Sequence, residues 1–223
     1  MSESSLMDTI CLGTTGMDIA RAVDVLRSGG IVAFPTDTVY GIGAHAYLSA
    51  AVEQLYVAKG RPEVKAIPLL ISSLAALPEV AAEIPDQAYT LAARFWPGAL
   101  TLVLRRTARV PDAVTSGGDT VAVRVPDHPV VQALIAALGA PLAATSANRS
   151  EQPAPATAGD VAAQLGGRIH LILDGGTCPG GVASTVLDLT VSPARILRQG
   201  GIPAAELAAL VPLAGYGLGQ TGP

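Results

Sequence analysis

The feature that most constrains the fold is a regular alternation of short apolar stretches with segments of helical periodicity. This alternation favours a single α/β domain, in which helices pack on a mixed β-sheet. The predicted strands are 31–35, 67–71, 100–104, 120–125, 141–145, 169–173, 184–189 and 194–197. The predicted helices are 17–27, a segment that Ser49 can cap and that ends before Gly60, 86–95, 129–138, 156–165 and 204–210.

The composition allows a large core and argues against some classes of protein. Half of the residues are hydrophobic and only 4% are aromatic, so Ala, Val, Leu and Ile must form most of the core. The formal net charge is −4. Bulk charge therefore predicts no general affinity for nucleic acids or anionic membranes.

Cysteine usage and the N-terminal sequence predict a cytoplasmic protein. Cys11 and Cys178 lie far apart and form no disulfide framework, as is typical of a reducing compartment. The first ten residues have no basic start and no apolar run of signal length, and no stretch approaches the ~18 apolar residues of a membrane span. The three histidines lack metal-ligand spacing, so we assign no metal ligands to side chains.

The tripeptide Lys59-Gly60-Arg61 is notable because the chain has only one other lysine, Lys65. Cations at a helix C-terminus ordinarily complement the helix dipole, which is worth ~0.3–1 kcal/mol. Because Gly60 permits a sharp turn, the two cationic groups could instead converge on one anion, such as a triphosphate or a carboxylate. We expect Lys59 to face solvent at the helix end and to contact little of the core.

Polar residues also follow the predicted strands, where ligands bind in open α/β sheets. Ser146 and Asn148 follow the strand 141–145, although an ordinary turn would also explain them. The segment 35–43 combines three hydroxyl groups, an acid and two glycines. Its glycines begin a formal G-x-G-x-x-A match, but they do not directly follow the strand, and the next helix starts near Ser49. A dinucleotide site is therefore not favoured.

Two arginines interrupt or end strand patterns. Arg124 lies in the apolar stretch 120–125, and because an unpaired buried charge is costly, it must face a partner or a ligand. An ion pair with an aspartate and a contact with a ligand carboxylate are equally consistent with this position. Arg198 ends another strand and allows the same two interpretations. Ser184 follows a glycine-rich loop, which could bring backbone N–H groups to an anion or simply be flexible.

Seven motifs occur in a fixed order, namely PTDTVYGIG, YVAKGRP, FWPGALTLVL, TVAVRVPDHP, ATSANRSEQPAPAT, ASTVLDL and ILRQGGI. Together they resemble the YrdC family, the threonylcarbamoyl-AMP synthases, from about residue 17 to residue 203. The resemblance implies a YrdC-like catalytic domain over 17–211, with a twisted mixed β-sheet, flanking helices and a concave ligand groove. Residues 1–16 would be an N-terminal extension and 212–223 a flexible tail. Long family members carry a further C-terminal domain, and we expect this chain to be the single-domain form.

The resemblance also implies an activity. As an L-threonylcarbamoyladenylate synthase, the chain would join L-threonine and bicarbonate into N-carboxythreonine. This carboxylate would attack the α-phosphorus of ATP in the presence of Mg²⁺, giving threonylcarbamoyl-AMP and pyrophosphate. A TsaD-type transferase would then use the adenylate, in a transient partnership, to modify the tRNA adenosine next to the anticodon. Contact with RNA would be secondary, and no membrane would be involved.

Residue roles follow from the same resemblance. The family's K-x-R and S-x-N signatures place the catalytic residues at Lys59, Arg61, Ser146 and Asn148. Threonine would contact Thr38, Arg124, Ala144 and Ser184. ATP would contact Arg61, Lys65, Thr120, Ser146, Ala154 and Arg198. Cations suit this chemistry because carboxylate attack on a phosphate brings negative charges together.

The chain departs from the family pattern in two places. Many members have Asn-Pro-Leu after K-x-R-P and a histidine soon after it, whereas this chain has Lys65 and no histidine there. Lys65 would replace the asparagine, and one threonine contact stays unassigned. Ala154 stands where serine is frequent, so that contact would come from the backbone.

Two other functions stay open. A YrdC-like module also occurs in multidomain carbamoyltransferases of hydrogenase maturation, which use carbamoyl phosphate. An RNA-binding module is the second alternative, although the acidic charge and the few aromatic residues argue against RNA as the main ligand.

Overall fold

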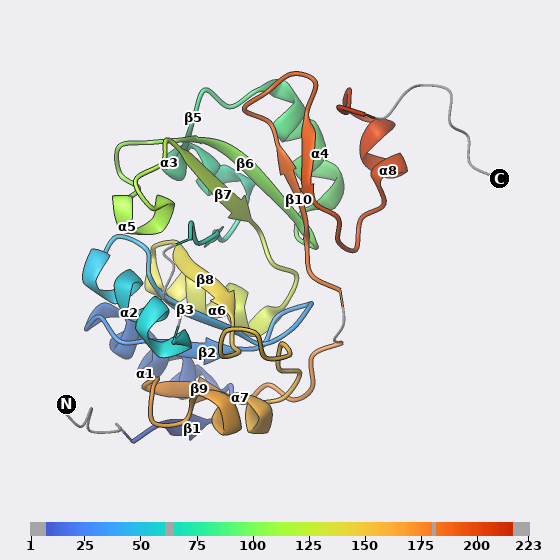
Figure 1. Cartoon of the computed structure of the whole chain (residues 1–223). Helices are drawn as coiled ribbons and strands as arrows, with labels where there is room; N and C mark the ends of the chain where they lie inside the picture. The colour runs from blue at the N-terminus through green and yellow to red at the C-terminus, as the bar shows by residue number, and fades with distance from the viewer. Residues whose placement is uncertain (1–7, 61–64, 180–181, 216–223) are drawn as a thin grey trace.

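The protein is described by a computed structural model that covers residues 8–60, 65–179 and 182–215. These residues form an 11-stranded mixed sheet in the order β1-β9-β2-β3-β8-β4-β7-β6-β10-β11, with β5 paired to β6 (Figure 1). The strands are β1 (Ile10–Leu12), β2 (Val32–Phe34), β3 (Gly41–His45), β4 (Leu69–Leu70), β5 (Ala81–Ala82), β6 (Leu100–Arg106), β7 (Thr120–Arg124), β8 (Leu142–Ser146), β9 (Leu171–Leu173), β10 (Thr185–Asp188) and β11 (Arg195–Arg198). The helices are α1 (Gly16–Arg27), α2 (Ser49–Lys59), the 3-10 helix η1 (Leu74–Ala76), α3 (Leu77–Val80), α4 (Asp86–Phe95), α5 (Asp112–Thr115), α6 (Pro129–Leu138), α7 (Ala158–Leu165) and α8 (Ala204–Ala208).

The sheet combines parallel and antiparallel pairs. Strand β9 runs parallel to β1 and β2, β4 runs parallel to β7, and β6 runs parallel to β10. The pairs β2/β3, β3/β8, β8/β4, β6/β7 and β10/β11 are antiparallel. The predicted mixed α/β architecture is therefore confirmed.

Side-chain alternation along the strands buries apolar groups on both faces of the sheet. In β2, Val32 and Phe34 join one core cluster, whereas Ala33 between them joins the other. Helices α1 and α6 cover the first face, and α2, α4 and α7 contribute to the second cluster. The described helices include none that is long and apolar enough to cross a membrane.

Strands β6, β7 and β10 bury one face more completely than the other. Val121 and Val123 lie in the core, whereas Thr120 and Ala122, on the opposite face of β7, are only half-buried. Arg124 shares the face of Thr120 and Ala122, because side chains two residues apart in a strand point the same way. Thr120 and Arg124, two of the candidate residues, therefore lie on the partly open face of β7.

Glycines in β3 allow an aromatic ring to pack directly on the strand. A Cβ atom at Gly43 would approach the Phe34 ring to 2.9 Å, and one at Gly41 to 3.1 Å. These glycines lie in a strand and not in a nucleotide-binding turn, so the reasons for setting aside a dinucleotide fingerprint are confirmed.

Several elements were missed or misjudged from the sequence. Strands β1, β3 and β5 and the short helices η1, α3 and α5 were not predicted. Strand β1 lies within the segment assigned as an N-terminal extension and pairs with β9. The capping role of Ser49 is wrong, because Leu48 occupies the N-cap position and makes no side-chain cap. Gly60 does end α2 in the left-handed conformation.

Candidate functional site

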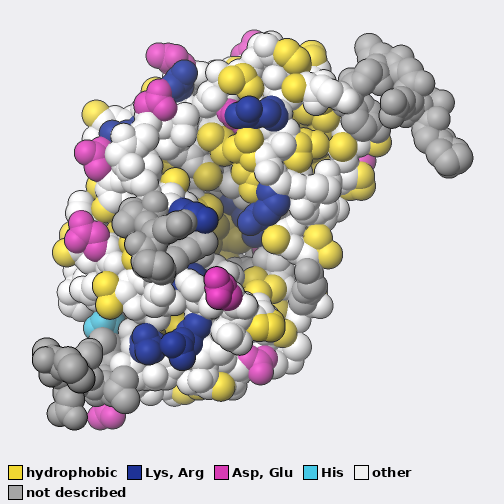
Figure 2. Space-filling model, in the orientation of Figure 1, with side chains coloured by type: hydrophobic (Ala, Val, Ile, Leu, Met, Phe, Trp, Pro, Cys, Tyr) yellow, Lys and Arg dark blue, Asp and Glu magenta, His cyan; other side chains and the backbone are white. Residues whose placement is uncertain are grey.

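Candidate residues from distant parts of the chain contact one another in the structure. They form three hydrogen-bonded groups, to which the β2–β3 loop, the end of α2, the ends of β7 and β8 and the strands β10 and β11 contribute. Figure 2 shows a hollow near the middle of the face drawn there, with hydrophobic surface inside it and Lys or Arg side chains beside it.

Lys59 organises the first group. Its ammonium donates to the carbonyl oxygens of Ser146 and Asn148 and to the side-chain oxygen Oδ1 of Asn148, the last two at 2.7 and 3.3 Å. The residue is only 5% exposed, so the expectation of a solvent-facing lysine is wrong. The physical reason is that an ammonium has three N–H donors, and the loop after β8 presents three oxygen acceptors to them.

The loop after β8 is further fixed by its own side chains. Ser146 Oγ donates to Asn148 Oδ1, and Asn148 Nδ2 donates to the carbonyl oxygens of Arg149 and Gln152, both at 2.8 Å. Gly41 of β3 pairs with Ser146 and sets its position in the sheet. Asn148 therefore stabilises a turn, which was the alternative interpretation of this segment. Its side chain also holds Ser146 beside Lys59.

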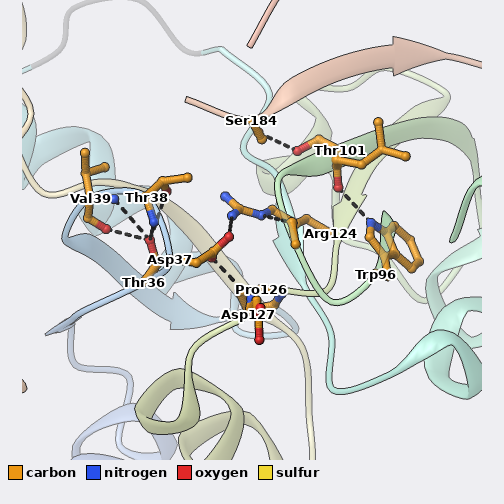
Figure 3. Close-up of polar contacts among 12 residues, drawn as sticks. Thr36, Asp37, Thr38, Val39, Trp96, Thr101, Arg124, Pro126, Asp127 and Ser184 are labelled. Carbon is orange, nitrogen blue, oxygen red and sulfur yellow. Dashed lines mark hydrogen bonds and ion pairs between the residues drawn. The ribbon is translucent and has the colours of Figure 1, made fainter. Parts of the chain in front are cut away.

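Arg124 and Asp37 form the centre of the second group. Arg124 Nη2 lies 2.6 Å from Asp37 Oδ2, and Arg124 Nε donates to the Gly98 carbonyl oxygen at 2.8 Å. Figure 3 shows the two charged side chains pointing toward each other. Burial lowers the pKa of Arg124, and the neighbouring carboxylate of Asp37 opposes this shift. The ion pair left open by the sequence is thus present.

Ser184 forms a third group with a second arginine, Arg198, and with Thr101. Arg198 donates through Nε and Nη2 to the Ser184 carbonyl oxygen, and through Nη2 to Ser184 Oγ at 3.1 Å. Ser184 Oγ also lies 2.8 Å from Thr101 Oγ1 (Figure 3). Burial lowers the pKa of Arg198, and the positive charge of Arg124 lowers it further. The positive charges of the Arg124 and Arg198 guanidinium groups therefore act on the same region.

Thr38 lies beside Asp37 in the β2–β3 loop. Thr36 Oγ1 donates to the Val39 carbonyl oxygen at 2.6 Å and lies 3.0 Å from Thr38 Oγ1. Thr36 Oγ1 also accepts from the backbone N–H groups of Thr38 and Val39, so its hydrogen-bonding capacity is already used. The Thr38 hydroxyl can therefore hydrogen-bond a ligand.

The remaining candidates are less closely connected. Thr120 lies on the same face of β7 as Arg124. The two residues are four positions apart, which corresponds to roughly 13 Å along the strand. Ala144 packs in the core of β8, and its N–H donates to the Pro68 carbonyl oxygen. Ala154 and Lys65 are exposed, and the Lys65 carbonyl oxygen accepts from Tyr56 Oη. Arg61 lies outside the described residues.

Sequence reasoning missed Asp37 and Thr101 as site residues. The sequence shows an acid in the segment 35–43 and allows an aspartate partner for Arg124. It contains no signal, however, that this acid is the partner of Arg124. Thr101 gave no signal, because a threonine inside an apolar strand is common.

A surface cavity of about 700 Å³ lies elsewhere, between the start of α2 and the segment joining β6 to α5. None of the candidate residues lines it. We therefore place the site by its chemistry and not by this cavity. Among the described residues, no group of three or more His, Cys, Asp or Glu is placed to hold a metal ion.

A mixed sheet that brings motif residues from distant segments into contact defines a YrdC-type domain. The family model for Sua5, YciO and YrdC, described as telomere recombination, matches residues 24–200. The chain belongs to this family, and the matched span contains every candidate residue from Thr38 to Arg198.

Curated relatives and a solved structure support this assignment. The threonylcarbamoyl-AMP synthase of Pyrococcus abyssi is 48% identical over 85% of this chain and 56% of its own length. The enzyme of the same name from Bacillus subtilis is 46% identical over 90% of this chain and 58% of its own length. The structure of P. abyssi Sua5 complexed with L-threonine superimposes with a TM-score of 0.86 and 43% identity, covering 93% of this chain and 62% of that one. The chain thus spans a little over half the length of these two curated relatives.

Proposed function

We propose that this chain has L-threonylcarbamoyladenylate synthase activity, making threonylcarbamoyl-AMP and pyrophosphate from L-threonine, bicarbonate and ATP. The observation that carries the proposal is that two arginines whose charges act on each other, Arg124 and Arg198, are held by Asp37 and by Ser184. The L-threonine complex of the P. abyssi relative supports an amino acid as one ligand.

Charge and hydrogen-bonding capacity suit threonine between the second and third groups. Arg124 and Arg198 bring two positive charges, and Asp37 compensates one of them through its ion pair. The remaining positive charge would attract the carboxylate of threonine. The Thr38 hydroxyl would form a hydrogen bond with the amino or hydroxyl group of the substrate.

The first group would hold ATP. Lys59 fixes the loop that carries Ser146 and Asn148, and Ser146 would contact the nucleotide together with Arg61, Lys65, Thr120, Ala154 and Arg198. Mg²⁺ would arrive with ATP and neutralise phosphate charge.

In the reaction, a carboxylate oxygen of N-carboxythreonine would form a bond to the α-phosphorus, and the bond from that phosphorus to the bridging oxygen would break, releasing pyrophosphate. The cations of the site would stabilise the charge that accumulates in this transition state.

The product would serve the threonylcarbamoyladenosine modification of tRNA in the cytoplasm. A TsaD-type transferase would consume the adenylate during a transient contact, and any contact of this chain with RNA would be secondary. These steps extend the proposal and depend on the synthase activity.

The test is a reconstituted reaction with purified protein, ATP, Mg²⁺, bicarbonate and threonine. We expect threonine-dependent release of pyrophosphate and an adenylate that mass spectrometry identifies as threonylcarbamoyl-AMP. Reactions without amino acid, and with carbamoyl phosphate in place of threonine and bicarbonate, serve as controls. Turnover with carbamoyl phosphate alone would instead support the carbamoyltransferase alternative. Binding of tRNA with steep salt dependence and no turnover of ATP would support the RNA-binding alternative.

A further inference from the structure

Asp37 connects two parts of the site, and the function proposed above uses only its negative charge. Its Oδ2 accepts from Arg124 Nη2 at 2.6 Å, and its Oδ1 accepts from the backbone N–H of Asp127 at 3.2 Å. Asp37 lies in the β2–β3 loop, whereas Arg124 ends β7, which is separated from β3 by β8 and β4 in the sheet. One carboxylate therefore ties this loop to the end of β7 and the segment after it.

Two contacts on different nitrogen atoms fix the plane of the Arg124 guanidinium. Nε donates to the Gly98 carbonyl oxygen, and Nη2 donates to Asp37. Because the guanidinium is rigid and planar, these two bonds also determine where Nη1 points. Nη1 makes no hydrogen bond to any other described residue, so its N–H groups are available to a ligand.

The negative charge of Asp37 also stabilises the positive charge of Arg124. The Arg124 side chain is 9% exposed, and the positive charge of Arg198 acts on the same region. A buried cation beside another cation is unfavourable unless a carboxylate compensates it. Asp37 supplies that carboxylate with its own side chain 17% exposed.

We propose that Asp37 is a positioning residue that orients Arg124 so that Nη1 meets the carboxylate of threonine. Asp37 acts through Arg124 and does not contact the substrate itself. Thr38, the next residue, then approaches the same substrate from the loop that Asp37 anchors. This inference rests on the proposed function for the identity of the ligand, but the geometry of Arg124 can be tested without any ligand.

The first arm of the test compares Asp37→Asn with Asp127→Asn by calorimetric titration with threonine and, separately, with ATP. Both variants remove one negative charge from the same region, but Asp127 contributes its backbone N–H to the contact described above. We expect Asp37→Asn to weaken threonine binding by about 10-fold or more, since a charge-assisted hydrogen bond is lost. ATP binding of Asp37→Asn and both affinities of Asp127→Asn should stay within about 2-fold of wild type, within the usual range for exposed substitutions.

The second arm measures hydrogen exchange of the Arg124 Nε–H group by NMR without ligand, with Arg124→Lys to assign the signal. We expect this proton to exchange slowly in wild type and in Asp127→Asn, and clearly faster in Asp37→Asn. A purely structural role would change the melting temperature and both affinities together, whereas the proposal predicts a loss confined to threonine.

The outcomes separate the inference from the proposed function. Equal or tighter threonine binding by Asp37→Asn overturns the inference, as does an unchanged exchange rate at Nε. Parallel loss of threonine and ATP affinity with a large drop in melting temperature overturns it as well. If wild type binds no threonine, the proposed function fails, and the exchange rate still decides whether Asp37 positions Arg124.

Discussion

Lys59 Nζ lies 2.7 Å from the backbone carbonyl oxygen of Asn148, which is 89 residues further along the chain. This contact joins the end of α2 to the loop after β8. It means that the lysine of the K-x-R signature supports the S-x-N signature directly. A role in holding the loop is therefore part of any effect that a substitution of Lys59 has on activity.

We predict that Lys59→Met lowers both stability and turnover. The substitution leaves the oxygen atoms that Lys59 contacts without their donor, and losing a buried hydrogen-bonding partner typically costs about 1–3 kcal/mol. Denaturant unfolding and pyrophosphate release measure the two effects. As a control, Arg21→Met changes an exposed cation and should alter stability by no more than about 0.5 kcal/mol. Unchanged stability of Lys59→Met would contradict the structural role.

The burial of Lys59 shows what the sequence could not predict. Its position at the end of α2 followed correctly from helical periodicity and Gly60. Its acceptors, however, are two backbone carbonyl oxygens and an amide oxygen in a distant loop. Backbone acceptors leave no trace in residue type, so only the tertiary structure shows them.

The missed strands have a similar physical explanation. Periodicity predicted β6, β7 and β8 because their apolar side chains alternate or run continuously. Strand β3 begins with glycines, which favour turns locally, and it becomes a strand because Phe34 packs over the missing Cβ atoms. Strand β1 is short and largely exposed, so its hydrogen bonds to β9 define it better than any apolar pattern does.

We predict that Thr101→Val weakens threonine use with little loss of stability. Valine keeps the shape of threonine but removes the hydroxyl that lies 2.8 Å from Ser184 Oγ. Loss of one such hydrogen bond costs about 0.5–1.5 kcal/mol, and among the described residues the Ser184 hydroxyl would keep only its contact with Arg198. Steady-state kinetics should show a raised KM for threonine and an unchanged KM for ATP.

Thr185→Val is the matched control for Thr101→Val. Thr185 Oγ1 donates to the Ile202 carbonyl oxygen and accepts from the N–H groups of Gly200 and Ile202. Its removal should lower the free energy of unfolding by at least about 1–3 kcal/mol. The KM for threonine in the folded fraction should change little. The same change of KM in both variants would contradict a specific role for Thr101.

We predict that protonation of His128 destabilises the fold as the pH falls. His128 Nδ1 accepts from the Val130 N–H at the start of α6, and burial lowers the pKa of His128, although Asp37 and Asp127 oppose this. The folded pKa lies below the unfolded value of about 6.5, so the unfolded chain binds more protons in this range. The stability that neutral His128 contributes to the fold is therefore present above about pH 6.5 and is lost as the pH falls through the folded pKa.

His128→Asn tests this dependence because asparagine is also a good N-cap. The free energy of unfolding should fall less between about pH 7 and pH 5 in the variant than in wild type. Burial also lowers the pKa of His45, so some dependence on pH should persist in both proteins. Identical pH profiles would show that His128 does not contribute.

We predict that serine is a poor substrate and valine a far poorer one. A missing methyl group is rejected by only ~10–200-fold, because it changes binding by ~1–3 kcal/mol. A site that hydrogen-bonds a hydroxyl can reject an analogue without it by up to ~10⁴–10⁵, since its polar groups are left unpaired. In the proposed function, Thr38 and Ser184 would recognise the hydroxyl. Pyrophosphate release with the three amino acids decides the order, and equal rates with valine and threonine would contradict it.

The most direct test of the proposed function follows the carbamoyl carbon. The protein is incubated with ATP, Mg²⁺, threonine and bicarbonate labelled with carbon-13, and the adenylate is analysed by mass spectrometry. Synthase activity predicts threonylcarbamoyl-AMP that carries one labelled carbon and appears only when threonine and bicarbonate are both present. Pyrophosphate release without an adenylate, or an adenylate that lacks the label when labelled bicarbonate is the only carbamoyl source supplied, would contradict the proposed function.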